Sequence, residues 1–259
     1  MSVALTLILA WLGIVYLRGS RRVMQPWRVA SFLAGLICTW VAVASPFAHF
    51  DGQTLTAHMI QHLLLMTFAP PLIWLGAPVR PLLYGWLKHR SLTVAAPFEA
   101  LQVLRGIGAV LSNPVVCWLS AAGALVVWHV PALLRLGMES PAWHLVEHVS
   151  FLAAGLLFWW PVVQPWPSVP RWPRWSVLLY LFLATLPCDV LAGLLVFSDR
   201  LAYPVYLCTP HRTGFSALED QQCAGALMWT CVTVVFLVAG TILSTQLLSQ
   251  RSEQEVVPL

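Results

Sequence analysis

The chain has 259 residues, of which 59% are hydrophobic and 9% are charged, and its mean hydropathy is +0.78. Soluble domains carry about 25% charged residues, so this composition excludes a soluble globular protein and predicts an integral membrane protein. The formal net charge is +4, but the basic residues are spread through short loops, so no nucleic-acid partner is expected.

The apolar segments predict an all-α integral membrane protein with a single transmembrane domain over 1–259. A span requires roughly 20 mostly apolar residues, and no hydrophilic stretch is long enough for a second fold. The first segment is followed directly by RGSRR, which is typical of an uncleaved first span rather than of a signal peptide. The predicted bundle has about seven transmembrane helices, at approximately 2–17, 27–47, 56–77, 113–131, 141–163, 175–197 and 221–247.

Local signals mark several boundaries of these elements. The stretch 78–112 is polar enough to leave the membrane, and 96–108 within it is predicted to lie along the inner surface as an amphipathic helix. Asn113 and Ser140 each precede a proline, an arrangement that favours a helix start. The run QPWPSVPRWPRW predicts a rigid interfacial connection, and Asp220 is predicted to cap the last helix.

The basic residues predict the orientation of the bundle. If the N-terminus is outside, the inner segments hold 11 of the 14 basic residues, and the outer segments hold only Arg135, Arg200 and Arg212. By the positive-inside rule, this bias places the N-terminus outside and the C-terminus in the cytoplasm.

Histidines gather at the predicted outer face. His58 and His62 lie four residues apart in TAHMIQHLLLM, so they share one face of the third span. His144 and His148 form an equivalent pair on the fifth span, and His129 closes the fourth. Only His89 falls inside; the outer seven are His49, His58, His62, His129, His144, His148 and His211.

Three helices place polar groups at a similar depth. At about 1.5 Å rise per residue, His62 lies roughly 9 Å below Thr56, and His148 lies roughly 12 Å below Ser140. Asp189 lies about 12 Å below the outer end of the sixth span. A polar group at such depth usually marks a functional site, so these helices are expected to share one.

Histidine pairs of this kind suit a borderline metal such as copper or zinc. Glu147 lies one turn from His144 and is expected to orient a ligand imidazole. The predicted metal-site residues are His58, His62, His129, His144, His148 and Asp189, with Asp189 balancing the charge of the ion or gating its release. Soft ligands that would favour Cu(I) are Met59, Met66, Cys188, Cys223 and Met228. A polar network that joins the helices without a metal is the alternative.

Several blocks of the sequence resemble a known family. HMIQHLLL followed by APPLIWLGAPVRPLL is similar to the third helix of the multi-span CtaG-type cytochrome c oxidase assembly factors. WHVPALL, WHLVEHVSFLAAGLLFWWPVV, LAGLLVFSDRLAYPVY and EDQQCAGALMW resemble its later blocks in the same order, so the resemblance covers about 50–232.

The resemblance implies a role in the maturation of haem-copper terminal oxidases, at the step where copper enters. The motif histidines carried over are His58, His62, His129, His144 and His148, together with Asp220 of the last block. The expected protein is a multi-pass assembly factor of the bacterial inner membrane and not an enzyme. Its expected partners are the lipid bilayer, oxidase subunits and a periplasmic or extracellular copper donor.

Two other functions remain open. Histidines on facing helices also form bis-His haem sites, so a haem-binding membrane redox enzyme is the main alternative. Both members of each pair lie on one helix, however, whereas axial ligands approach a haem from opposite sides. A zinc-dependent hydrolase would use Glu147 as its general base, but HLVEH differs in order from H-E-x-x-H.

Overall fold

The computed structural model describes residues 2–20, 24–50, 52–87, 113–165, 172–208 and 214–256. The predicted surface helix at 96–108 and the centre of the proline-tryptophan run lie outside these residues, as do His89 and His211. The side chain of His49 is also outside the described part of the chain.

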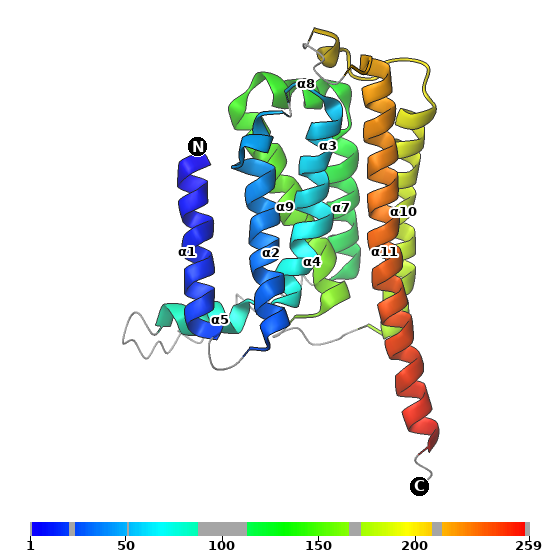
Figure 1. The fold of residues 1–259 in the computed structure, drawn as a ribbon. Helices are drawn as coiled ribbons and strands as arrows, with labels where there is room; N and C mark the ends of the chain where they lie inside the picture. The colour runs from blue at the N-terminus through cyan, green and yellow to red at the C-terminus, as the bar shows by residue number, and fades with distance from the viewer. Residues whose placement is uncertain are drawn as a thin grey trace.

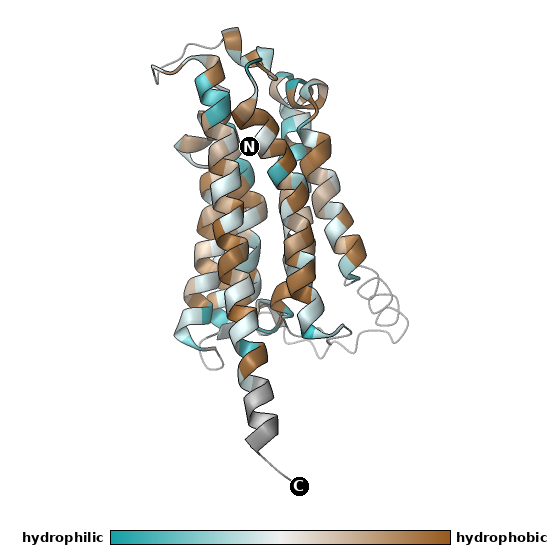
Figure 2. Cartoon of the chain, turned by 90° about the vertical axis from the view of Figure 1, so that its right-hand side faces the viewer, coloured by the Kyte–Doolittle hydropathy of each residue, from teal (hydrophilic) through white to brown (hydrophobic). Residues whose placement is uncertain are grey.

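Long helices run side by side, with the two ends of the chain at opposite ends of the bundle (Figure 1). Each is rich in apolar residues, and many of these are exposed on the outside of the bundle, as expected for a surface that faces lipid. Hydrophobic residues dominate the long helices in Figure 2. The long helices are α1 (Ser2–Ser20), α2 (Pro26–Val43), α9 (Pro141–Val163), α10 (Arg174–Phe197) and α11 (Ala217–Val256).

Shorter elements complete the bundle. A continuous helical segment consists of α3 (Leu55–Leu63), the π-helical turn η2 (Leu64–Phe68) and α4 (Ala69–Leu75). The other short elements are the 3-10 helices η1 (Pro46–His49) and η3 (Pro204–Cys208), together with α5 (Val79–Leu87), α7 (Pro114–Trp128) and α8 (Pro131–Glu139).

The predicted class, an all-α membrane protein, is confirmed. Within the described residues, 6 helices are long and apolar enough to cross a membrane, and the number is 7 if the bent pair α7 and α8 is counted as one span. The fourth predicted span differs in detail, because α7 ends at Trp128 and α8 begins at Pro131 after a bend of 76°. Pro131 lacks the backbone N–H that would extend the hydrogen bonds of α7, and it stands in the first turn of α8 instead.

The π-helical turn has a cause in the sequence. Pro70 lacks the N–H that would bind the Met66 carbonyl, and its ring excludes that carbonyl from the regular helical position. The freed Met66 oxygen instead accepts a hydrogen bond from Trp159 Nε1 of α9 at 3.2 Å. A Cβ at Gly155 would lie 2.8 Å from the same oxygen, so the glycine allows α9 to pack closely here. This contact fixes how α9 faces the helix that carries His58 and His62.

Candidate metal centre

The start of α3 is held by a residue from a distant part of the chain. Asp220 of α11 accepts hydrogen bonds from Leu55 N at 2.6 Å and from Thr56 N at 3.3 Å. The prediction that Asp220 caps its own helix is therefore wrong: α11 begins earlier, and Asp220 caps α3 instead. A buried carboxylate at a helix N-terminus satisfies unpaired N–H groups and complements the helix dipole.

Ser216 and Glu219 take over the capping of α11. The Glu219 carboxylate accepts hydrogen bonds from Ser216 N at 2.7 Å, and Glu219 N donates to Ser216 Oγ at 3.3 Å. This reciprocal pair is a capping box. The sequence signal for it, serine followed three residues later by glutamate, is present in SALE. Asp220 is therefore free to bind the neighbouring helix.

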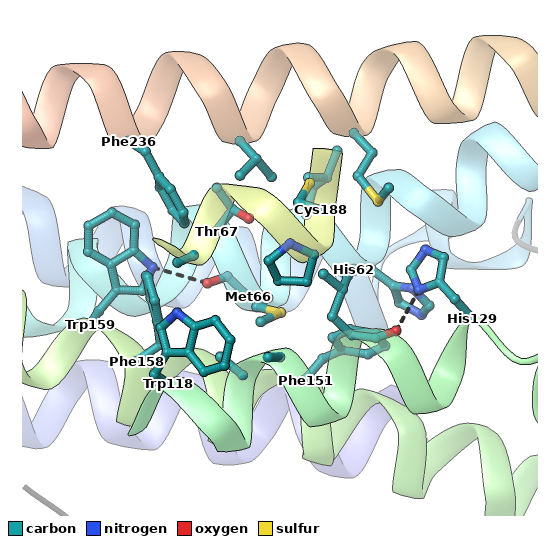
Figure 3. A pocket seen from close by; sticks show the side chains of 18 of the residues that line it. His62, Met66, Thr67, Trp118, His129, Phe151, Phe158, Trp159, Cys188 and Phe236 are labelled. Carbon is teal, nitrogen blue, oxygen red and sulfur yellow. Dashed lines mark hydrogen bonds between the residues drawn. The ribbon is translucent and has the colours of Figure 1, made fainter. Parts of the chain in front are cut away.

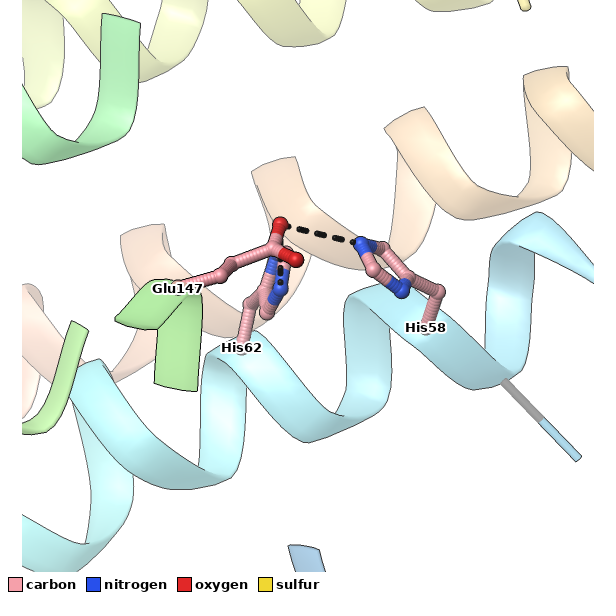
Figure 4. A group of neighbouring side chains, drawn as sticks. All are labelled: His58, His62 and Glu147. Carbon is pink, nitrogen blue, oxygen red and sulfur yellow. Dashed lines mark ion pairs between the residues drawn. The ribbon is translucent and has the colours of Figure 1, made fainter. Parts of the chain in front are cut away.

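His58, His62 and Glu147 converge in the interior of the bundle (Figure 4). Glu147 Oε1 of α9 lies 3.3 Å from His58 Nε2 and 3.2 Å from His62 Nε2 of α3. His58 and Glu147 are fully buried and His62 is nearly so. One donor atom from each of the three side chains lies within 4.8 Å of the others. We refer to these three residues as the ligand trio.

The polar atoms of the ligand trio have no hydrogen-bond partner outside the trio among the described residues. Glu147 Oε1 contacts the two Nε2 atoms, whereas His58 Nδ1, His62 Nδ1 and Glu147 Oε2 are buried without a hydrogen-bond partner. Buried polar groups are normally satisfied, so orphaned ones indicate a missing ligand, ion or water. Two ligands at about 2.1 Å from one metal ion in tetrahedral geometry are about 3.4 Å apart. The measured nitrogen–oxygen separations fit this spacing.

A glycine of α8 lies against the Glu147 carboxylate. A Cβ at Gly137 would be 2.8 Å from Glu147 Oε2, closer than such atoms normally approach, so only glycine leaves the carboxylate its present position. Gly137 is itself buried. The turn between α7 and α8 thus brings a short helix over the ligand trio from the upper end of the bundle in Figure 1.

The second histidine pair lies beside the trio. The His144 ring is stacked 6.0 Å from the His58 ring and lies 4.2 Å from His148. His148 Nε2 lies 3.1 Å from Gln61 Oε1, and the Gln61 amide nitrogen donates to the Ala48 carbonyl. Because Gln61 therefore presents an acceptor, His148 carries its proton on Nε2 and retains Nδ1 as its basic nitrogen. His148 is thus a neighbour of the trio that is already hydrogen-bonded.

His129 approaches from the end of α7. Its Nδ1 donates to the Leu125 carbonyl at 2.7 Å, which leaves Nε2 as the basic nitrogen, and this atom is buried without a hydrogen-bond partner among the described residues. An N–H bound to a backbone carbonyl is the usual arrangement for a histidine that binds a metal through its other nitrogen. Tyr203 fixes the backbone by donating to the His129 carbonyl at 3.0 Å.

His62 and His129 line a cavity of about 60 Å³ that extends toward the centre of the bundle (Figure 3). Its walls are mostly apolar and aromatic. Four sulfur-containing side chains also line it, namely Met59, Met66, Cys188 and Met228. Four of the five soft ligands considered from the sequence therefore share this cavity, whereas Cys223 is exposed.

Asp189, which was predicted to be a metal-site residue, does not lie with the five predicted histidines. Its neighbour Cys188 faces the cavity, and successive residues on an α-helix point about 100° apart. Asp189 is half-buried, and among the described residues no ion pair joins it to a histidine. The five histidines thus gather on α3, α7 and α9, whereas the aspartate of α10 lies apart.

The chain matches the sequence profile of the cytochrome c oxidase caa3 assembly factor family, Caa3_CtaG, over residues 10–250. This match includes nearly the whole chain and extends beyond the blocks recognised at 50–232. The chain belongs to this family. Membership in Caa3_CtaG confirms the resemblance.

Curated relatives of this Caa3_CtaG chain come from mycobacteria. An uncharacterized protein of Mycobacterium leprae is 25% identical over 251 residues, which cover 91% of this chain and 37% of the relative. Uncharacterized proteins of Mycobacterium bovis and Mycobacterium tuberculosis are 24% identical over 230 residues, which cover 85% of this chain and 34% of each relative. The chain therefore spans about a third of the length of these curated relatives. No solved structure matches it.

Two site residues were missed or underestimated in the sequence of this Caa3_CtaG chain. Glu147 was expected to orient an imidazole or, in the hydrolase alternative, to act as a general base, whereas its carboxylate lies in contact distance of two histidines. Gln61 was not considered, although it holds His148. A glutamate within an apolar span was the available signal for Glu147, because carboxylates are rare there without a function.

Proposed function

We propose that this chain binds a copper ion between His58, His62 and Glu147 and delivers it to a haem-copper cytochrome c oxidase during assembly. The observation that carries the proposal is the ligand trio, in which the nitrogen and oxygen atoms of three buried side chains converge with no hydrogen-bond partner outside the trio among the described residues. A purely structural network would be expected to satisfy these atoms, because each unsatisfied buried group costs about 1–3 kcal/mol. A bound cation would satisfy them together.

The surroundings of the trio favour copper over zinc. Two imidazoles and a carboxylate suit several divalent metals, including zinc, iron and copper. Thioether and thiol groups select Cu(I), and Met59, Met66 and Cys188 line the cavity that adjoins His62. A site of this kind offers nitrogen and oxygen ligands on one side and sulfur ligands on the other. It therefore suits an ion that is held for transfer, as cargo, better than a permanently bound ion.

The second histidine pair provides a route toward the outer end of the bundle. His144 is only half-buried, whereas His148 and the trio lie deeper. The ring centroids are 4.2 Å apart from His144 to His148 and 6.2 Å apart from His148 to His62. An ion received from a donor outside the bacterial inner membrane could pass along these imidazoles. His129, which lines the cavity beside His62, assists through its basic Nε2.

Metal content tests the proposal directly. The protein would be purified in a neutral detergent from copper-replete membranes, and copper, zinc and iron would be measured by mass spectrometry beside an absorption spectrum. We expect about one copper ion per chain and its loss in the variant His58→Ala/His62→Ala. The matched control is Glu139→Gln on α8, because Glu139 is 61% exposed and pairs only with Arg135 in the described structure.

Each result has a distinct meaning. Copper that is retained by the control and lost by the double variant supports the trio as the binding site. A protein that binds no copper under either reducing or oxidising conditions would overturn the proposal. A Soret band that depends on the same histidines would instead support the haem-binding alternative, and stoichiometric zinc would make copper the wrong metal.

A further inference from the structure

A second cavity lies at the opposite end of the bundle from the ligand trio. It encloses about 380 Å³, which is within the usual range for a small-ligand site. Its walls come from the start of α2, the end of α4, the start of α5 and the end of α9, which meet at the lower end of the bundle in Figure 1. Because no residue of the trio lines it, this cavity is independent of the proposed copper site.

The cavity combines positive charge with aromatic rings. Two arginines, Arg28 and Arg80, line it beside Trp27 and Trp74, and none of its described lining residues is acidic. Guanidinium groups bind phosphate through paired hydrogen bonds, and tryptophans favour the headgroup depth of a membrane. The lining therefore has the chemistry of a site for a phosphate-bearing anion.

The Arg28 side chain is held in place by its neighbours. Its guanidinium lies 4.7 Å from the centre of the Trp27 ring, which is within cation–π range. Its Nη1 donates to the Leu75 carbonyl at 3.4 Å. These contacts use one face and one edge of the guanidinium, so its remaining donors are available to an anion. An arginine restrained in this way loses less conformational freedom when it binds a ligand.

Strained backbone borders the same cavity. The non-glycine residues with positive φ in the described structure are Ala77, at 45°, and Gln164, at 49°, and both line this cavity. A left-handed conformation is unfavourable for a residue with a Cβ, and such strain is concentrated at ligand-binding sites and turns. The residue before Ala77 is held against α1, because Tyr16 of that helix donates to the Gly76 carbonyl at 2.7 Å.

We propose that this cavity binds the phosphate group of an anionic ligand, either a phospholipid headgroup or free phosphate. Its position at a membrane end and its apolar residues, among them Met24 and Val163, favour the lipid. The orientation predicted from the basic residues places this end in the cytoplasmic leaflet, where anionic lipids are concentrated. The bound headgroup would link the ends of α2, α4, α5 and α9.

Native mass spectrometry of the detergent-purified full chain tests this proposal. Phosphatidylglycerol, phosphatidylcholine and inorganic phosphate would each be titrated, and binding would be compared for the native protein and Arg28→Gln/Arg80→Gln. We expect phosphatidylglycerol to bind preferentially and the double variant to bind it at least tenfold more weakly. The matched control is Arg174→Gln, because Arg174 begins α10 at the same end of the bundle, is exposed and does not line the cavity.

The two sources of phosphate give different results. Arginine-dependent binding of phosphatidylglycerol that inorganic phosphate does not displace supports a lipid site. Arginine-dependent binding of inorganic phosphate alone supports an anion site for free phosphate. Equal binding of both phospholipids, or equal losses in the double variant and the control, would overturn the proposal.

A photoactivatable phosphatidylglycerol provides a test that needs no variant. Cross-linking to the native protein, followed by peptide mapping, should label segments that contain Trp27, Trp74 or Gln164. Labelling confined to other segments would contradict the proposal even if the arginine variants failed to fold. Copper binding is not required for either measurement, so failure here and failure of the copper proposal are distinguishable.

Discussion

Two buried polar clusters lie near the same end of the bundle, but they differ in how their polar atoms are satisfied. In the first, Asp220 accepts from two backbone N–H groups of α3, and Gln221 both accepts from Ala202 N and donates to the Arg200 carbonyl. In the second, the polar atoms of the ligand trio contact one another but have no hydrogen-bond partner elsewhere among the described residues.

The contrast separates a structural role from a binding role. Both clusters are almost fully buried, so burial alone does not distinguish them. Satisfied groups add to the stability of the fold, whereas groups left unsatisfied reduce it unless a ligand completes them. We therefore expect substitutions in the Asp220 cluster to change folding stability and substitutions in the trio to change metal binding.

The largest expected effect is on stability, for Asp220→Ala. This change leaves Leu55 N and Thr56 N without their acceptor, and hydrogen bonds to a charged group contribute about 1.5–3 kcal/mol each. We expect the free energy of unfolding in detergent to fall by about 4 kcal/mol. Glu139→Ala, at an exposed position, should change it by less than about 0.5 kcal/mol. Equal stability of the two variants would contradict the capping role of Asp220.

Glu147→Gln should mainly weaken copper binding, whereas Asp220→Ala should mainly lower the stability of the fold. Loss of the charged oxygen ligand should weaken copper binding about 100-fold, equivalent to about 2.7 kcal/mol. Stability without metal should fall by less than in Asp220→Ala, because glutamine is a neutral isostere whose amide oxygen can still accept a hydrogen bond from His58 or His62. Chelator competition and denaturant unfolding measure the two quantities. A loss of stability as large as that of Asp220→Ala would instead indicate a structural polar network.

Gly137→Ala tests the position of the carboxylate without changing a ligand. The added methyl group would lie 2.8 Å from Glu147 Oε2, so the carboxylate must shift away from the two histidines. We expect copper binding to weaken about tenfold, because ligand positions must be held within about 0.5 Å. The control is Gly123→Ala, where an added Cβ meets no atom within 4 Å. Equal affinity of both variants would show that α8 does not position Glu147.

The sequence was sufficient to predict features that depend on local patterns. The fifth span was predicted at 141–163 and observed as Pro141–Val163, because a proline start and a continuous apolar run define it. The histidine pairs follow from spacing alone. Asp220 was assigned to the wrong helix because its partner Leu55 lies 165 residues away in the sequence. A local sequence pattern does not predict a contact over that separation. The rotation that turns Glu147 toward α3 likewise depends on long-range packing at Gly155.

Asp189→Asn gives the smallest expected effect and tests a residue that the sequence places at the same depth as the histidines. Because Asp189 makes no ion pair with them in the described structure, we expect copper affinity to change less than about twofold, or about 0.4 kcal/mol. The measurement is the same chelator competition, with Glu147→Gln as the positive control. A tenfold loss would show that Asp189 balances the charge of the ion through a rearrangement of α10, and would extend the site across the sulfur-lined cavity.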